Sequence, residues 1–378
     1  MIRTAIKFMH FERSKSVGIT IGIVISIFLI GQQLGTLGFL TGLMGGVVES
    51  SNPAVADLWV VTNQTQNANQ LSNIDISLVN SLKSVAGVKN TYPVVFAQGK
   101  LKFDNGQFTS VTLIGSEYPA FIAGPNPLKL EAGNLNELIK EGAFSADFFD
   151  KRNYLHPITI GTQVEINGKS AYIAVNTKNA RGYGNSYMYS DISNARSYGN
   201  FPGDKVSSVI VEVKDKNRID EVKNAINNGF YGVRAWKRGD FKQTTVSKIV
   251  KESNIGLSFG SLVVFAIVSG FFIIGLTLYS STFDRVKDYG TLKAIGANNS
   301  YISKLVILQS FLYAIVGFAV AMILLFAMKA AVAKAGLILQ IPLTLVFELL
   351  LMTLFISVGG SFFAVVKLWK LEPASVFR

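Results

Sequence analysis

Four long apolar stretches alternate with polar sequence along the chain. They cover residues 17–48, 255–283, 302–333 and 343–366. Each is longer than the roughly 20 residues that a helix needs to cross the hydrocarbon core of a bilayer. The pattern therefore predicts four transmembrane helices, the first of which is long enough to continue past the membrane as a stalk.

The polar sequence between the first two spans, residues 49–254, has the short alternating apolar runs of a folded domain. Residues 92–103 and 107–116 alternate as strands do and flank Asn105-Gly106, a pair typical of tight hairpin turns. A β-rich subdomain is expected to be inserted at about residues 120–198. We therefore expect an α+β membrane protein with one large extracytoplasmic domain between its first and second transmembrane helices.

The remaining runs of this domain predict a split α/β layer with helices on one side. Strands are expected at residues 57–62, 206–213 and 233–236, helices at 75–85 and 218–227, and a helical stalk at 240–253.

The first 16 residues have the pattern of an amphipathic helix. Arg3, Lys7 and His10 fall on one helical face, and Ile2 and Met9 on the opposite one. Such a helix is suited to lie on a membrane surface. A signal peptide is the alternative, but the apolar run that follows is too long for one and no small-residue cleavage site ends it.

Positive charge beside the spans orients the chain. Basic residues cluster in residues 1–16, 284–301 and 367–378. Because loops rich in Lys and Arg stay on the cytoplasmic side, we expect these three segments and both termini in the cytoplasm. Residues 49–254 and the short loop 334–342 are then expected outside.

Composition excludes several classes of function. The chain is 49% hydrophobic and 16% charged, which is too apolar for an ordinary soluble protein. Its net charge is +12, but residues 49–254 mix both signs, so no nucleic-acid-binding stripe is expected. There is no cysteine, and the two histidines, His10 and His156, are expected on opposite sides of the membrane. No catalytic, cofactor-binding or metal-binding residue is therefore predicted.

Glycines recur along the first span at spacings of four and three residues. They are Gly31, Gly35, Gly38, Gly42 and Gly45. Small residues on one helix face let another helix approach closely in lipid, so we expect a helix interface there, between two copies of the chain. The alternative is that glycine is simply common in membrane helices.

Tyrosines and arginines gather within the expected β-rich subdomain. The cluster comprises Tyr183, Tyr187, Tyr189 and Tyr198 with Arg181 and Arg196. Aromatic and arginine side chains together form many binding surfaces, but they also cover inert loops. Contact with a substrate or partner and a purely structural role both remain open.

The loop between the second and third spans, residues 284–301, predicts a short amphipathic helix. Asp284, Lys287, Asp288 and Thr291 fall on one helical face, while Gly296 is expected to end the helix. Asn298, Asn299 or Ser300 can then cap the next helix. An ordinary basic loop obeying the positive-inside rule is the alternative.

This loop carries a family signature. Its residues are Arg285, Asp288, Gly290, Leu292, Ala294, Ile295, Gly296, Ala297 and, further on, Gln309. Their spacing resembles the motif R-x-x-E-x-G-x-L-x-A-I-G-A that follows the second membrane helix of MacB/FtsX-type ABC transporter permeases. Asp288 replaces the usual Glu and Lys293 a common Arg, and the local sequence resembles the LolC/DevC-like members. The end of the chain, residues 371–378, resembles the terminal motif of the family.

The resemblance implies a mechanism and a set of partners. In this family the loop is a coupling helix that docks on a cytoplasmic ATPase subunit, which assigns ATPase coupling to Arg285, Asp288, Gly290, Leu292, Lys293, Ile295 and Gly296. The chain encodes no G-x-x-x-x-G-K-[ST] loop, so ATP and Mg²⁺ are expected on the partner and no enzymatic activity on this chain.

The resemblance further implies a homodimer or a pair with a paralogue in a bacterial inner membrane. A periplasmic adaptor and an outer-membrane channel are possible additional partners, alongside membrane lipid. ATP-driven motion would serve export or efflux. The alternative is an FtsX-like regulator that transmits ATPase motion to a cell-wall hydrolase, although about two hundred residues outside the membrane favour the exporter.

Overall fold

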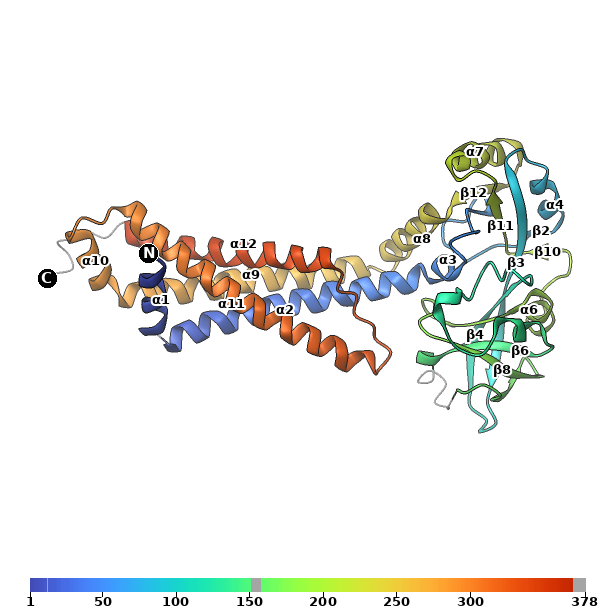
Figure 1. Ribbon diagram of the computed structural model, residues 1–378, viewed down its shortest axis with the longest axis horizontal. Helices are drawn as coiled ribbons and strands as arrows, with labels where there is room; N and C mark the ends of the chain where they lie inside the picture. Colours follow the sequence, from blue (N-terminus) through green and yellow to red (C-terminus); the bar gives the residue numbers. More distant parts are fainter. Residues whose placement is uncertain (12, 151–157, 370–378) are drawn as a thin grey trace. The chain divides into compact units, whose positions relative to one another are not determined.

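The computed structural model describes residues 1–11, 13–150 and 158–369. The chain divides into two compact units (Figure 1). We call the unit that comprises Met1–Phe39 and the chain from Asn254 onwards the helical unit, and Leu40–Ser253 the inserted domain.

Six helices make up the described part of the helical unit. They are α1 (Ile2–Phe11), α2 (Arg13–Met44), α9 (Ile255–Asp284), α10 (Val286–Ala294), α11 (Asn299–Ala333) and α12 (Leu343–Trp369). Four of them, α2, α9, α11 and α12, are long and apolar enough to cross a membrane, which confirms the expected four-span layout. The helix expected at residues 1–16 ends at Phe11, and the first span already begins at Arg13.

The membrane helices pack closely where small residues meet. A Cβ added to Gly360 of α12 would lie 3.1 Å from the backbone nitrogen of Gly275 and from the backbone oxygen of Phe271, both on α9. The two helix backbones therefore approach as closely as glycine permits.

The inserted domain is built on one ten-stranded sheet. Its long strands are β1 (Leu58–Thr62), β3 (Val88–Lys102), β4 (Phe108–Ser116), β6 (Ala143–Asp147), β7 (Gln163–Ile166), β8 (Lys169–Thr177), β9 (Ser186–Asp191), β11 (Ser208–Val213) and β12 (Val233–Lys237), with short β5 (Leu130–Ala132) at one edge. The strand order is β12-β1-β11-β3-β7-β8-β5, with β4 joining β3 to β9 and β6 beside β8. A separate small pair joins β2 (Ile74–Asp75) to β10 (Lys205–Val206).

Helices and short 3₁₀ turns complete this domain. The helices are α3 (Gly46–Ser50), α4 (Ser77–Lys83), α6 (Ile192–Tyr198), α7 (Ile219–Gly229) and α8 (Arg238–Glu252), and the turns are η1 (Pro127–Lys129), η2 (Leu135–Ile139), η3 (Phe148–Asp150) and η4 (Lys216–Arg218). The helix expected at 75–85 is shorter, because Ile74–Asp75 pairs as a strand before α4 begins.

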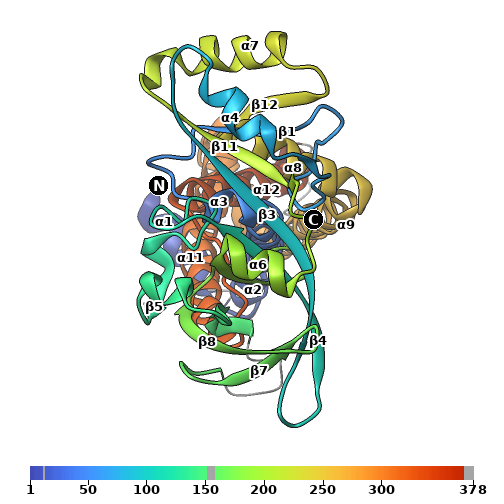
Figure 2. The ribbon, with the colours of Figure 1, turned by 90° about the vertical axis from the view of Figure 1, so that its right-hand side faces the viewer.

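The strand β3 spans both halves of the sheet (Figure 2). Its first residues pair with β11, from Val88↔Val213 to Val94↔Ser208, and its last pair with β7 at Leu101↔Ile166. Segment 120–198 supplies β5 to β9 and α6, so this β-rich part continues the same sheet and shares its core with β3 and β4.

Helices cover both faces of the other half of the sheet, which corrects the expectation of helices on one side only. Leu82 of α4 and Val222 of α7 pack on one face. On the opposite face Phe241 of α8 lies 5.9 Å, between ring centroids, from Trp59 of β1. Side chains alternate across a strand, so each strand of this half contributes to both cores.

The hairpin expected at Asn105-Gly106 is confirmed. β3 and β4 pair antiparallel up to Lys102↔Phe108, and Gly106 has a positive φ of +80°, which glycine adopts without strain. Asn167 and Gly168, which also have positive φ angles, form the turn that connects β7 to β8.

Candidate coupling site

The corner between α9 and α10 is formed by Arg285, whose side chain is only 8% exposed. Its guanidinium carbon lies 4.5 Å from the ring centroid of Phe8 and 5.0 Å from that of Phe11, both on α1. One turn on, Tyr289 is 2% exposed and stacks on Phe8, with ring centroids 5.7 Å apart and an interplanar angle of 11°. Cation–π and ring-stacking contacts thus attach the inner face of α10 to α1.

The two ends of this segment are attached to other helices. The ammonium group of Lys293 donates to the backbone oxygen of Leu368, at 2.9 Å, near the end of α12. A cation there compensates the partial negative charge of the last carbonyls of a helix. Asp284, the last residue of α9, forms an ion pair with Lys15 at the start of α2.

Backbone hydrogen bonds fix how α10 ends. Gly296 has φ +105°, its N–H donates to the oxygen of Lys293, and the N–H of Ala297 donates to the oxygen of Leu292 at 2.9 Å. This is the Schellman pattern, which satisfies carbonyls that the helix leaves open. Asn298 then caps α11, since its side-chain oxygen accepts from the N–H of Tyr301 at 2.8 Å.

The outer face of α10 is exposed. Lys287, Asp288, Thr291 and Ile295 lie on it, and Ile295 is 79% exposed. A large apolar side chain among charged ones is suited to contact another protein. Because the inner face is held by α1 and α12, this outer face is presented in a fixed orientation.

The seven residues assigned to ATPase coupling divide between these two faces. Asp288, Ile295 and Gly296 are exposed, Leu292 and Lys293 are half-buried, and Arg285 and Gly290 are buried. Arg285 therefore does not belong to an exposed recognition face, and Asp284 belongs to α9 instead of α10. The sequence did not lead us to predict Phe8 as a contact of this segment, although an aromatic residue on an amphipathic N-terminal helix could have indicated one.

Gly31, Gly35 and Gly38 of the first span face other parts of the same chain. A Cβ on Gly31 would lie 2.7 Å from a methyl carbon of Leu325 on α11. Gly35 and Gly38 face the extended segment before α12, where the N–H of Gln340 donates to the oxygen of Gly35 at 3.2 Å. Gly35 and Gly38 therefore contact a loop instead of a helix. Contact of the stripe, including Gly42, with a second copy stays a prediction.

The tyrosine and arginine cluster is structural in most of its members. Tyr187, Tyr189 and Tyr198 are buried, and their hydroxyls donate to Asn69, Ala180 and Ser170, respectively. Arg196 donates to the backbone oxygen of Pro202 at 2.6 Å. The ligand interpretation is therefore not supported for these four residues.

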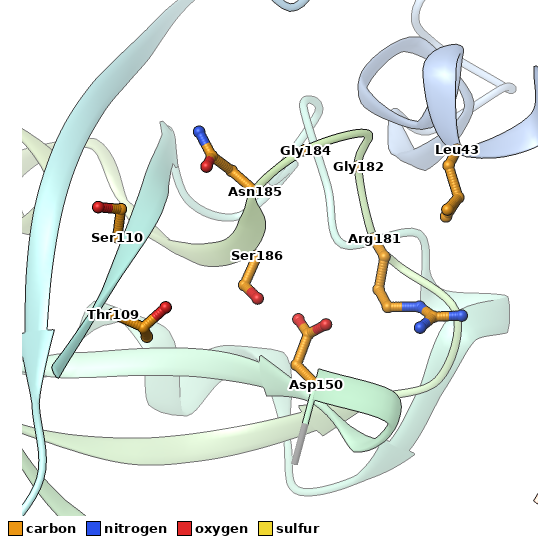
Figure 3. A pocket seen from close by; sticks show the side chains of 9 residues that line it. All are labelled: Leu43, Thr109, Ser110, Asp150, Arg181, Gly182, Gly184, Asn185 and Ser186. Atoms are coloured by element: carbon orange, nitrogen blue, oxygen red, sulfur yellow. The ribbon is translucent and has the colours of Figure 1, made fainter. Parts of the chain in front are cut away.

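Arg181 lines a polar pocket of about 600 Å³ in the inserted domain. Figure 3 shows its side chain near Asp150, with Thr109, Ser110 and Asn185 across the cavity. Asp147, whose Oδ1 lies 3.8 Å from the Nε atom of Arg181, is fully buried and accepts from the N–H groups of Ala180 and Phe149. Burial raises the pKa of Asp147 above its ordinary value despite these hydrogen bonds.

The helices at the two ends of the inserted domain are joined. Glu49 of α3 accepts from the ammonium group of Lys242 of α8 at 2.5 Å. The guanidinium of Arg238 donates to the backbone oxygen of Glu49, at 3.1 Å, and to the hydroxyl of Ser51. Burial raises the pKa of Glu49, but the hydrogen bond and charge of Lys242, together with the charges of Lys129 and Arg238, outweigh it and leave that pKa below its ordinary value. We call these contacts the α3–α8 junction.

Among residues 1–11, 13–150 and 158–369, no group of three or more His, Asp or Glu side chains is arranged to hold a metal ion. His156 and the terminal motif at 371–378 lie outside the described residues.

Comparison with known proteins agrees with this layout. Residues 16–228 match the MacB-like periplasmic core domain, and residues 260–373 match the FtsX-like permease C-terminal domain. Four spans with an α+β domain inserted after the first and a short helix between the second and third define an ABC transporter permease. The chain belongs to the MacB/FtsX-type family of these permeases.

Two solved structures are similar to parts of the chain. The periplasmic region of MacB from Actinobacillus actinomycetemcomitans is 15% identical with a TM-score of 0.39, over 52% of this chain and 94% of that one. The extracellular domain of the ABC-type transporter YknZ from Gram-positive bacteria is 15% identical with a TM-score of 0.36, over 48% and 100%.

Proposed function

We propose that this permease couples ATP hydrolysis on a separate cytoplasmic ATPase to movement of its inserted domain, in the service of export or efflux. The observation that carries the proposal is the two-faced coupling helix. Its outer residues Asp288 and Ile295 are exposed for docking, while Arg285, Tyr289 and Lys293 are held by α1 and α12. ATP and Mg²⁺ bind to the partner in this scheme.

Movement of the ATPase would pass from α10 into the membrane helices by covalent and packed connections. α10 follows α9 through the single residue Arg285, and α9 follows α8 of the inserted domain through Ser253 and Asn254. The first membrane helix, α2, provides the second covalent connection and runs without interruption from Arg13 to Met44. A mechanical route of this kind needs no polar channel across the bilayer.

Membership of the family supports a proposal for the surrounding assembly. We propose that both termini are cytoplasmic in a bacterial inner membrane, that the inserted domain is outside, and that two permease copies or paralogues each engage an ATPase. A periplasmic adaptor and an outer-membrane channel fit an exporter. An FtsX-like regulator of a cell-wall hydrolase is the second candidate, and the extent of the inserted domain, Leu40–Ser253, favours export.

The test is recovery and activity of the ATPase with the affinity-tagged chain. Asp288→Lys and Ile295→Glu change the outer face of α10 and should reduce both the ATPase recovered from membranes and the ATP hydrolysis that the permease regulates. Glu141→Lys makes the same kind of charge reversal at an exposed site of the inserted domain and serves as the control. Wild-type recovery and hydrolysis in both α10 variants would refute docking through this face.

A further inference from the structure

A groove of about 630 Å³ lies in the helical unit between α1, the start of α2 and α11. Figure 1 shows α1, in dark blue, meeting the beginning of α2 at a steep angle, and α1 contacts α11. The walls are mostly apolar and are formed by Ile6, Met9, Val17, Leu312 and Val316. The groove therefore has the lining of a site for a hydrocarbon chain.

Three of these apolar side chains are strongly exposed. Ile6 is 52%, Val17 is 55% and Val316 is 50% exposed. Leu312 and Val316 are four residues apart, so they lie one above the other on α11. Together they make an apolar strip that water would solvate poorly and that an acyl chain would cover.

One end of the groove is polar. A nitrogen of the Arg13 guanidinium lies 2.7 Å from the Nε2 atom of His10. Among the described residues this is the one hydrogen bond that the Arg13 side chain makes, and a guanidinium has five N–H donors. Arg13 is held by His10 and keeps donors for an additional acceptor.

The wall at this end is cross-linked by Ser16. Its hydroxyl donates to the backbone oxygen of Met9, at 2.7 Å, and lies 2.6 Å from the hydroxyl of Tyr313. These bonds join α1, α2 and α11 around the groove, so the cation and the apolar strip keep a fixed spacing. Four residues of helix separate Arg13 from Val17, a rise of about 6 Å.

We infer that this groove binds one anionic phospholipid. The phosphate accepts hydrogen bonds from Arg13, and an acyl chain lies along Val17, Leu312 and Val316. Charge selects an anionic headgroup, since the first sixteen residues hold four basic side chains, Arg3, Lys7, Arg13 and Lys15, against the single acid Glu12.

A bound lipid would also stabilise α1 in its place. The same helix carries Phe8, on which Arg285 and Tyr289 of the coupling helix pack. Loss of the lipid would therefore loosen the support of α10 without changing the outer face of that helix.

The test measures lipid retained by the full-length chain, purified in detergent after reconstitution with phosphatidylglycerol and phosphatidylcholine in equal amounts. Native mass spectrometry counts each lipid per chain. Wild type should retain phosphatidylglycerol in preference to phosphatidylcholine. Arg13→Ala should reduce retention about tenfold, as expected for loss of a charge-assisted hydrogen bond, and Arg13→Lys should retain part of the difference.

Two matched substitutions separate this site from general attraction to the membrane. Val316→Trp fills the groove and should also reduce retention, whereas Ile323→Trp, at a 68% exposed position of α11 outside the groove, should not. Lys7→Ala removes an exposed cation of α1 that does not line the groove, and it should leave retention unchanged.

Three results would overturn the inference. Equal retention of the two lipids by wild type would remove the headgroup preference, and an equal loss in Lys7→Ala and Arg13→Ala would reduce it to surface charge. Displacement of the lipid by millimolar inorganic phosphate would indicate an anion site without an acyl-chain contribution. Size-exclusion profiles that match the wild type confirm that each variant is folded.

Discussion

Replacing Arg285 by alanine should release α1 from α10. The guanidinium is 8% exposed and lies within 5.0 Å of the ring centroids of both Phe8 and Phe11. A desolvated cation–π contact contributes up to about 2 kcal/mol, and an exposed one about 0.5–1 kcal/mol. We therefore expect Arg285→Ala to weaken docking of α1 by about 2 kcal/mol, roughly 30-fold in the docking equilibrium.

The absence of native cysteine provides the assay. Ala5 of α1 is completely buried, so a cysteine placed there reacts with a maleimide only when α1 opens. If opening and closing are fast compared with labelling, the labelling rate follows the population of the open form. In the Ala5→Cys background, Arg285→Ala should raise that rate about 30-fold.

A double-mutant cycle with Phe8→Ala isolates the contribution of one ring, expected at about 1 kcal/mol. Asp288→Ala is the matched control, because that side chain is exposed on the outer face and should not affect α1. Unchanged labelling in Arg285→Ala, or an equal rise in Asp288→Ala, would refute the assignment of Arg285 to an internal anchor.

Three further results are expected. Gly360→Leu should lower the thermal unfolding temperature in detergent, since overpacking against the α9 backbone costs about 1–3 kcal/mol. Gly260→Leu should not lower it, because nothing lies within 4 Å of the Cβ position of Gly260. Equal effects of the two substitutions would contradict close packing of α9 and α12. Because the pKa of Asp147 is raised, the folded chain binds more protons than the unfolded one, so the contribution of Asp147 to stability falls as the pH rises above about 4. Denaturation followed by tryptophan fluorescence should show that Asp147→Asn removes this fall in stability. An identical pH profile of stability in the variant and the wild type would argue against the shift. Finally, an impermeant thiol reagent applied to intact cells should label a cysteine at Asn105 but not one at Asn298, and the reverse pattern would invert the topology.

Segment type was predictable because the signals were local. Apolar runs longer than a bilayer specified four helices, and Asn105-Gly106 specified a hairpin whose register the structure confirms. The ends of the helices were less predictable. Arg13 begins the first span although it is charged, because a helix end can hold polar residues that reach the membrane surface.

The coupling site was predicted only in part, for a geometric reason. Helical periodicity from Asp284 assumes one continuous helix, but α9 ends there and α10 begins at Val286. Arg285 lies at the corner with φ −104° and ψ 18°, outside the phase of either helix, and its side chain packs on α1. No pattern within the loop reveals a partner such as Phe8, nearly 280 residues away in the chain.

The α3–α8 junction brings the two ends of the inserted domain together. Because Glu49 is paired with Lys242, and Arg238 donates to the backbone of α3, the chain enters and leaves this domain at adjacent points. Adjacent ends are what permit one domain to be inserted into another without stretching its host. A domain of a different size is therefore expected to fit between the first and second spans without a change in α10 or in the four long apolar helices.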